Sequence, residues 1–197
     1  MFLSKNPGIV FVHIYKNAGT SIRRSLLRAG IPDQSGDFGL PNHATASEII
    51  AGIGQDEFRQ RLSFAVVRNP WDWQVSLYRY VLEKPNHHQH EMIRGFGDFE
   101  TYIDWRCREE VRLQKSFVTD DSGSILVDRI LKFENLGEEF AKLCDELDVR
   151  VDLPHLNASR RGQWQDCYDE RTFQLIKRTF AADIDMFGYG DCRLPAA

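Results

Sequence analysis

The chain has 197 residues, 42% of them apolar and 27% charged, with a formal net charge of −4. This length gives one well-buried core and is short for two domains, so we predict a single domain over residues 1–197. The composition excludes a disordered or fibrous protein, and the acidic balance argues against nucleic acid as a partner.

The charge is distributed unevenly along the chain. Residues 1–84 hold ten Lys/Arg against seven Asp/Glu, a balance of +3, which leaves −7 for the remainder. An acidic protein with a basic N-terminal half is suited to holding an anion there. No CxxC pair occurs among the four cysteines, which favours reduced structural thiols over a disulfide scaffold.

No apolar run is long enough to span a bilayer, and no signal peptide is visible at the N-terminus. We therefore predict no membrane span and a cytoplasmic location, although a trimmed lumenal catalytic domain would show the same features. The sequence predicts no particular oligomeric state.

The first predicted unit is a strand, a small-residue turn and a helix. Gly8–Ile14 is an almost continuous run of β-branched and aromatic residues, as in a parallel strand covered on both faces. Small residues follow, and then Ile22, Leu26 and Leu27 recur at helical spacing. Strand, turn and helix in this order are typical of a phosphate-binding unit.

Further elements alternate along the rest of the chain. Residues 31–43 indicate a loop, residues 86–97 a polar mobile stretch, and residues 120–123 a turn. Predicted strands at Phe64–Val67 and Ile130–Phe133 alternate with helices that begin near Thr45 (a capping box with Glu48), Trp71, Phe99, Asn135 (a cap with Glu138) and Asp169. This alternation predicts an α/β, P-loop-like three-layer fold with a central, mainly parallel sheet flanked by helices.

The first turn is the best candidate for a phosphate cradle. Backbone amides at a helix N-terminus attract anions, Gly19 permits close approach, Thr20 and Ser21 add hydroxyls, and Lys16 adds a charge. The GxxxxGK[ST] pattern of a Walker A loop is absent, because Lys16 precedes the glycine. The alternative is an ordinary loop with a surface lysine.

Two motifs carry a resemblance to a known family. Phe11–Ser21 resembles the 5′-phosphosulfate loop of sulfotransferases that use 3′-phosphoadenosine 5′-phosphosulfate (PAPS), and Val67–Tyr78 resembles their 3′-phosphate motif, an Arg followed eight residues later by a Ser. The similarity is closest to the carbohydrate branch, which includes heparan sulfate 2-O-sulfotransferase and small bacterial members. Segments 42–46, 127–136, 153–157 and 183–189 agree as well, and residues 86–110 agree least.

The resemblance implies a donor site and its residues. PAPS would be the co-substrate and 3′-phosphoadenosine 5′-phosphate (PAP) the product, with no metal. Lys16 would neutralise the charge that grows on the leaving oxygen, and Arg68 and Ser76 would bind the 3′-phosphate. The full set of implied donor-binding residues is Lys16, Asn17, Ala18, Gly19, Thr20, Ser21, Arg68, Ser76, Arg160, Arg161 and Gly162.

Some positions depart from the family pattern or keep a second interpretation. Tyr15 replaces the usual Pro, and Asn17 stands where Thr is common, but neither change removes the backbone amides. Trp73 replaces a frequent arginine, which puts a local ion pair in doubt. Arg160 and Arg161 could equally be solvated charges, and Arg23 and Arg24 are expected on the helix surface, although one of them could face the donor.

The acceptor hydroxyl needs a general base, and His43 is the first candidate because it matches the family motif and an imidazole titrates near neutral pH. His155 is a rival, and His13 is another, although it is expected inside a strand as a hydrogen-bonded core residue. His87, His88 and His90 suggest a metal site, but a solvated loop is the better interpretation.

The sequence therefore predicts transfer of a sulfuryl group from PAPS to an acceptor hydroxyl, on a carbohydrate or glycoconjugate, by in-line displacement with a histidine base. The alternatives are a P-loop nucleotide kinase and a non-catalytic module of the same fold. Acceptor specificity is expected in residues 31–43 and 86–115, where four arginines are either glycan contacts or surface charge: Arg94, Arg106, Arg108 and Arg112.

Overall fold

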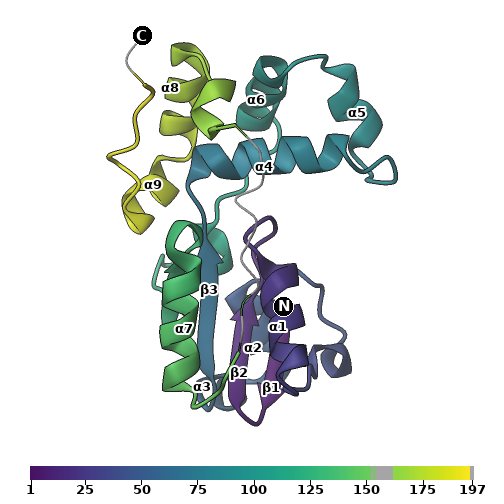
Figure 1. Ribbon diagram of the computed structural model, residues 1–197, viewed down its shortest axis with the longest axis vertical. Coiled ribbons are helices and arrows are strands. Elements are labelled where there is room, and N and C mark those ends of the chain that lie inside the picture. The colour runs from purple at the N-terminus through teal and green to yellow at the C-terminus, as the bar shows by residue number, and fades with distance from the viewer. Residues whose placement is uncertain (152, 154–161, 196–197) are drawn as a thin grey trace. The chain divides into compact units, whose positions relative to one another are not determined.

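The computed structural model describes residues 1–151, 153 and 162–195 (Figure 1). The chain divides into two compact units. The first comprises Met1–Arg68 and the described residues of 114–159, and it contains the sheet. The second comprises Asn69–Leu113 and the described residues of 162–195, and it is helical.

The first unit is built on a four-stranded sheet in the order β1-β2-β3-β4. Its strands are β1 (Phe2–Lys5), β2 (Gly8–Val12), β3 (Leu62–Val67) and β4 (Arg129–Lys132). β1 is antiparallel to β2, and the pairs β2–β3 and β3–β4 are parallel. Helices flank this mixed, mainly parallel sheet, which confirms the predicted α/β class.

Parallel pairing brings the carboxyl ends of the strands to one edge of the sheet. Val12, at the end of β2, pairs with Ala65, and Val67, at the end of β3, pairs with Lys132. Crevices outside the carboxyl ends of parallel strands are where α/β proteins place their ligands. The loop after β2 and Arg68 after β3 therefore leave the sheet at the same edge.

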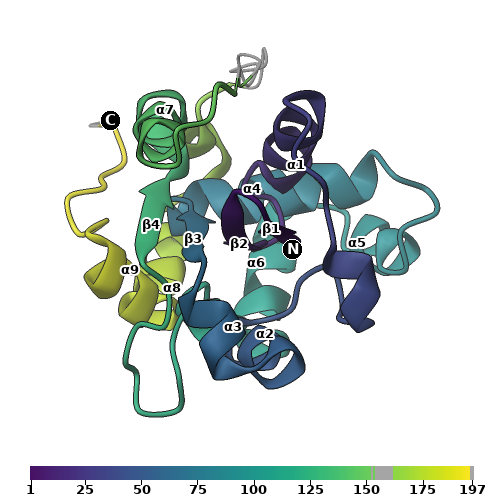
Figure 2. The ribbon, with the colours of Figure 1, turned by 90° about the horizontal axis from the view of Figure 1, so that it is seen from below.

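Alternate strand residues pack against helices on the two faces of the sheet. Ile9, Phe11, Phe64 and Val66 point toward α1 (Gly19–Arg28) and α7 (Leu136–Glu146), where Ile22, Leu26 and Phe140 complete a buried cluster. Figure 2 shows α1 and α7 on one face of the sheet, and α2 (Ala46–Ile53) and α3 (Gln55–Arg59) on the other. Burial on both faces explains why β2 and β3 are apolar apart from Gly8 and the buried Ser63.

The second unit consists of helices from two segments of the chain, which are separated in sequence by residues of the first unit. They are α4 (Pro70–Leu82), α5 (His90–Gly95), α6 (Phe99–Arg108), α8 (Glu170–Thr179) and α9 (Ala181–Phe187). Aromatic rings form much of its core, with Trp71 of α4 stacked at 4.7 Å on Phe173 of α8. Four 3-10 helices complete the described structure: η1 (Ser35–Phe38), η2 (Lys115–Phe117), η3 (Phe133–Asn135) and η4 (Trp164–Cys167).

Several local predictions are confirmed and others are wrong. The capping box of Thr45 and Glu48 is present, and Asp169 caps α8. The strand expected over Gly8–Ile14 ends at Val12, and the cap expected from Asn135 makes no side-chain hydrogen bond. Helix α5 lies inside the stretch expected to be a mobile loop, and strand β1 was not predicted. All four cysteines are thiols.

No helix among the described residues is both long and apolar enough to cross a membrane.

Candidate functional site

The loop between β2 and α1 has an unusual backbone. Lys16 and Ala18 adopt left-handed conformations, with φ of 66° and 60°, and Asn17 between them does not. A left-handed L-residue costs about 1–2 kcal/mol, so two in three residues indicate a loop whose shape is imposed by its surroundings. Alternation of hand turns successive backbone N–H groups toward one side, which is the geometry of an anion-binding nest.

The N-terminus of α1 continues this arrangement. Ala18 is the N-cap residue, makes no side-chain capping bond, and is followed by a first turn without acidic residues. Its carbonyl accepts from Ser21 N at 2.9 Å and Ile22 N at 3.0 Å, so the N–H groups of Gly19 and Thr20 lie ahead of the first intrahelical bond. These amides sit at the positive end of the helix dipole, where an anion is stabilised.

Gly19 is required by its contact with His13. A Cβ atom built on Gly19 would lie 1.8 Å from Nε2 of His13 and 1.9 Å from its Cδ2, far inside any van der Waals contact. Only glycine lets α1 begin this close to the imidazole. The predicted role of Gly19, close backbone approach, thus has a specific neighbour within the protein.

Arg68 follows the last residue of β3 and reaches back to the loop. Its Nη1 donates to the backbone carbonyl of Lys16 at 3.1 Å, and its Cζ lies 4.1 Å from the ring centroid of Phe133. The residue is 9% exposed. A guanidinium stacked on one face and bonded at one edge is held in place, which is the arrangement needed to recognise a phosphate bidentately.

The side chain of Asn17 points inward. Its Nδ2 donates to Val66 O at 2.8 Å and to Gln114 Oε1 at 2.8 Å, and the residue is 0% exposed. Only its backbone N–H can therefore fulfil the binding role expected for it. Its amide side chain instead ties the loop to the end of β3.

His43 is oriented by the backbone of His13. Its Nδ1 lies 2.8 Å from His13 O, and a carbonyl only accepts, so Nδ1 carries the proton. The neutral ring then has its lone pair on Nε2, the tautomer that a general base needs. The two imidazoles are also in contact, with ring centroids 4.5 Å apart.

His13 itself is a poor proton acceptor at neutral pH. Burial, with smaller contributions from the N-terminus, His43 and Arg23, lowers the pKa of His13 to about 3. A base works best when its pKa lies near the working pH, so His13 is a poor candidate for the general base. The sequence predicted His13 inside a strand, and this prediction is wrong, because β2 ends at Val12 and His13 follows it.

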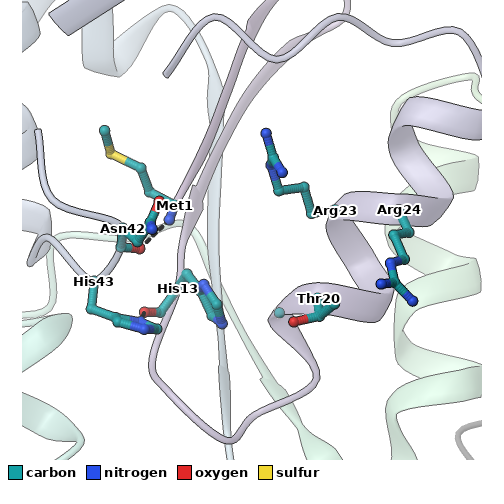
Figure 3. Close-up of a pocket in the computed structure, with 8 residues that line it drawn as sticks. Met1, His13, Thr20, Arg23, Arg24, Asn42 and His43 are labelled. Atoms are coloured by element: carbon teal, nitrogen blue, oxygen red, sulfur yellow. Dashed lines mark hydrogen bonds between the residues drawn. The ribbon is translucent and has the colours of Figure 1, made fainter. Parts of the chain in front are cut away.

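A cavity of about 360 Å³ opens beside the loop (Figure 3). It is lined by Met1, His13, Gly19, Thr20, Arg23, Arg24, Asn42 and His43. Figure 3 shows the two histidines side by side across from Thr20 and the two arginines of α1. Arg23 is paired with Asp33 at 2.7 Å. Neither Lys16 nor Arg68 is among the residues that line this cavity.

The structure brings most of the predicted site residues into the first unit. Lys16, Asn17, Ala18, Gly19, Thr20, Ser21, His43 and Arg68 all belong to it. Ser76 is a buried residue of α4 in the second unit, so its pairing with Arg68 stays a prediction. Gly162 is exposed. Arg160, Arg161 and the rival base His155 lie outside the described residues.

Two side chains that the sequence predicted at the surface are buried instead. Arg106, a candidate glycan contact, is 2% exposed and donates to Gln74 Oε1 at 3.2 Å while pairing with Glu110 at 3.2 Å. His90, expected in a solvated loop, is buried with Nδ1 2.9 Å from Val81 O. Among the described residues, no group of three or more His, Cys, Asp or Glu side chains is placed to hold a metal ion.

Sequence reasoning missed Gln114, whose side chain contacts both the loop and Arg68. The residue lies in a polar stretch without periodicity, and a single glutamine there carries no signal. Its role depends on a contact that spans 97 positions in sequence to Asn17 and 46 to Arg68.

Comparison with known proteins identifies the fold. No family model matches the sequence, and no curated protein matches it. Among solved structures, the mouse sulfotransferase SULT7A1 complexed with PAP is similar at a TM-score of 0.50 and 14% identity, over 93% of this chain and 86% of that chain. The chain therefore has a sulfotransferase fold.

Proposed function

We propose that this protein is a PAPS-dependent sulfotransferase that transfers a sulfuryl group to an acceptor hydroxyl. The observation that carries the proposal is the junction of the two predicted donor motifs, in which the Arg68 guanidinium donates to the backbone of Lys16 at 3.1 Å. The loop after β2 thus offers backbone amides and the Lys16 ammonium group, and the end of β3 offers the Arg68 guanidinium. Together they suit a nucleotide that carries phosphates on both the 5′ and the 3′ position of its ribose. PAP in the similar mouse enzyme supports the same ligand here.

The proposed donor site divides between these two strand ends. The 5′-phosphosulfate binds the amides of Gly19 and Thr20 at the start of α1, with Ser21 adding a hydroxyl. The 3′-phosphate binds Arg68, and the predicted contributions of Ser76, Arg160, Arg161 and Gly162 belong to the same proposal. Residues 1–197 are proposed to act as one sulfotransferase domain, and the cytoplasmic location stays a prediction.

The proposed reaction is an in-line displacement. The acceptor oxygen attacks sulfur as His43 Nε2 takes its proton, the new S–O bond forms, and the bond from sulfur to the phosphate oxygen breaks. PAP leaves with the charge on that oxygen, which Lys16 neutralises. The acceptor reaches His43 through the cavity, and a carbohydrate or glycoconjugate is the proposed class because the sequence motifs resemble the carbohydrate branch.

Thermal stability in the presence of PAP, ATP or buffer tests this function against the two alternatives. A ligand at about 100 times its Kd stabilises the folded state by about 2.7 kcal/mol, so PAP should raise the melting temperature and ATP should not. A response to ATP alone would indicate a nucleotide kinase. A response to neither would indicate a non-catalytic module.

Replacing Arg68 by alanine is expected to weaken PAP binding about 10- to 100-fold, because a hydrogen bond to a charged group contributes about 1.5–3 kcal/mol. Adenosine 5′-monophosphate, which lacks the 3′-phosphate, should bind the variant and the wild type equally. Calorimetry of both ligands measures the difference. Arg59, an exposed arginine of α3, provides the matched control R59A. Unchanged PAP affinity in R68A would exclude the 3′-phosphate contact.

Replacing His43 by alanine is expected to lower turnover about 10²–10⁴-fold while PAP affinity stays within about twofold of wild type. The rate is measured with labelled PAPS and whichever acceptor in a panel of sugars, lipids and phenols gives transfer. The exposed Gln60, which follows α3, gives the control variant Q60A, which should retain full activity. Full activity of H43A at neutral pH would move the base to His155 or elsewhere.

A further inference from the structure

The side-chain amide of Gln114 makes three hydrogen bonds at the junction of the two strand ends. Its Oε1 accepts from the Arg68 backbone N–H at 2.9 Å and from Asn17 Nδ2 at 2.8 Å. Its Nε2 donates to the Arg68 carbonyl at 2.7 Å. The residue is 0% exposed, so these bonds face no competition from water.

The position of Gln114 in the chain gives these bonds a second consequence. Arg68 is the last residue of the first unit before the chain enters the second, and Gln114 is the first residue after it returns. The Gln114 side chain therefore links the segment in which the chain leaves the first unit, at Arg68, to the segment in which it returns, at Gln114. Through Asn17, the same side chain also joins both to the loop that carries Lys16.

Asn17 adds evidence that the loop conformation has an energetic cost that other contacts must offset. Its Oδ1 is buried without a hydrogen-bond partner, although its Nδ2 makes two bonds. The two left-handed residues beside it add backbone strain. A loop with these costs keeps its shape only if other contacts over-determine it, and Gln114 supplies such a contact.

We propose that Gln114 is a positioning residue of the donor site, whose buried amide fixes the backbone of Arg68 against the loop of Lys16 so that the guanidinium and the loop amides keep one spacing. This proposal rests on the proposed function for the identity of the ligand, PAP. The role of Gln114 in holding the loop and the Arg68 backbone together does not depend on that ligand. Gln114 itself contacts no substrate in this account.

The variant Gln114→Met tests the proposal because methionine keeps the volume and removes all three bonds. The matched control is Gln74→Met in α4. Gln74 is also 0% exposed, and its amide accepts from Tyr102 Oη and Arg106 Nε, both at 3.2 Å, within the second unit. Both variants should lose stability, and only Q114M should alter the donor site.

The first measurement is hydrogen exchange without ligand, at a temperature at which circular dichroism shows both variants folded. Amides of residues 15–21 and of Arg68 should exchange at least about tenfold faster in Q114M than in Q74M. Equal exchange in this segment would overturn the positioning role whatever the protein binds. If Q114M does not fold, Asn17→Leu removes the same link from the loop side, and the same acceleration is expected.

The second measurement is PAP affinity by calorimetry in a double-mutant cycle with Arg68→Ala. Q114M should weaken PAP binding about tenfold in the wild-type background and less than about twofold in the R68A background, because Gln114 acts through Arg68. Equal losses in both backgrounds would overturn this coupling. Absence of PAP binding by the wild type would instead overturn the proposed function, and the exchange result would still decide the role of Gln114.

Discussion

Replacing Lys16 by alanine is expected to lower the rate of sulfuryl transfer about 10²–10³-fold, which is the usual loss when one well-placed charge at a developing anion is removed. The substitution is suited to the loop, because alanine adopts a left-handed backbone at a cost similar to that of lysine, and Ala18 already does so at φ 60°. The fold should therefore survive, and PAP affinity should fall much less than turnover.

Rates and PAP affinities of K16A and K5A, measured side by side, check this result. Lys5 is an exposed lysine at the end of β1, so K5A removes the same charge from the same unit away from the loop. The ratio of turnover to affinity should change in K16A alone. Near-normal turnover in K16A would remove Lys16 from the mechanism.

Replacing Gly19 by alanine is expected to abolish PAP binding at ligand concentrations that saturate the wild type. The added methyl would lie 1.8 Å from Nε2 of His13, so either α1 or the imidazole must move. Forcing an extra methyl into a packed site costs about 1–3 kcal/mol, and here the displaced atoms include the amides that bind the phosphosulfate. Calorimetry with PAP measures the loss, and the melting temperature reports the strain.

A second substitution shows whether this clash is the cause. His13→Ala removes the obstructing ring, so PAP binding should return in part in the G19A/H13A double variant, and the two effects should be strongly non-additive. Gly137 in the first turn of α7 has no atom within 4 Å of a Cβ, so G137A should leave both binding and stability intact. Normal PAP affinity in G19A would show that the start of α1 is not the phosphate site.

The parts of the fold that depend on local patterns could be predicted from the sequence. The continuous apolar runs of β2 and β3 and the capping box of Thr45 identify their elements by themselves. Strand β1 could not be predicted, because its four residues carry no alternation and form a strand only by pairing with β2. Helix α5 was missed because only two of its six residues, His90 and Ile93, are buried, which is too few to give a helical pattern.

In the candidate site as well, the residues in local motifs could be predicted from the sequence, and the contacts between distant segments could not. Lys16, Gly19 and Arg68 belong to motifs that sequence alone identifies, and the structure brings all three into one unit. The inward direction of Asn17, the contact of His13 with Gly19 and the bonds of Gln114 depend on packing between distant segments. Arg106 gave a misleading signal, because an arginine in a polar stretch looks exposed until its partner Glu110 and its burial are known.

A crystal structure of the protein with bound PAP would locate both phosphates of the nucleotide. We expect the 3′-phosphate within hydrogen-bond distance of the Arg68 guanidinium and the 5′-phosphate on the amides of Gly19 and Thr20. PAP bound with either phosphate elsewhere, for example with its 3′-phosphate on Arg23 and Arg24 in the cavity, would contradict this expectation.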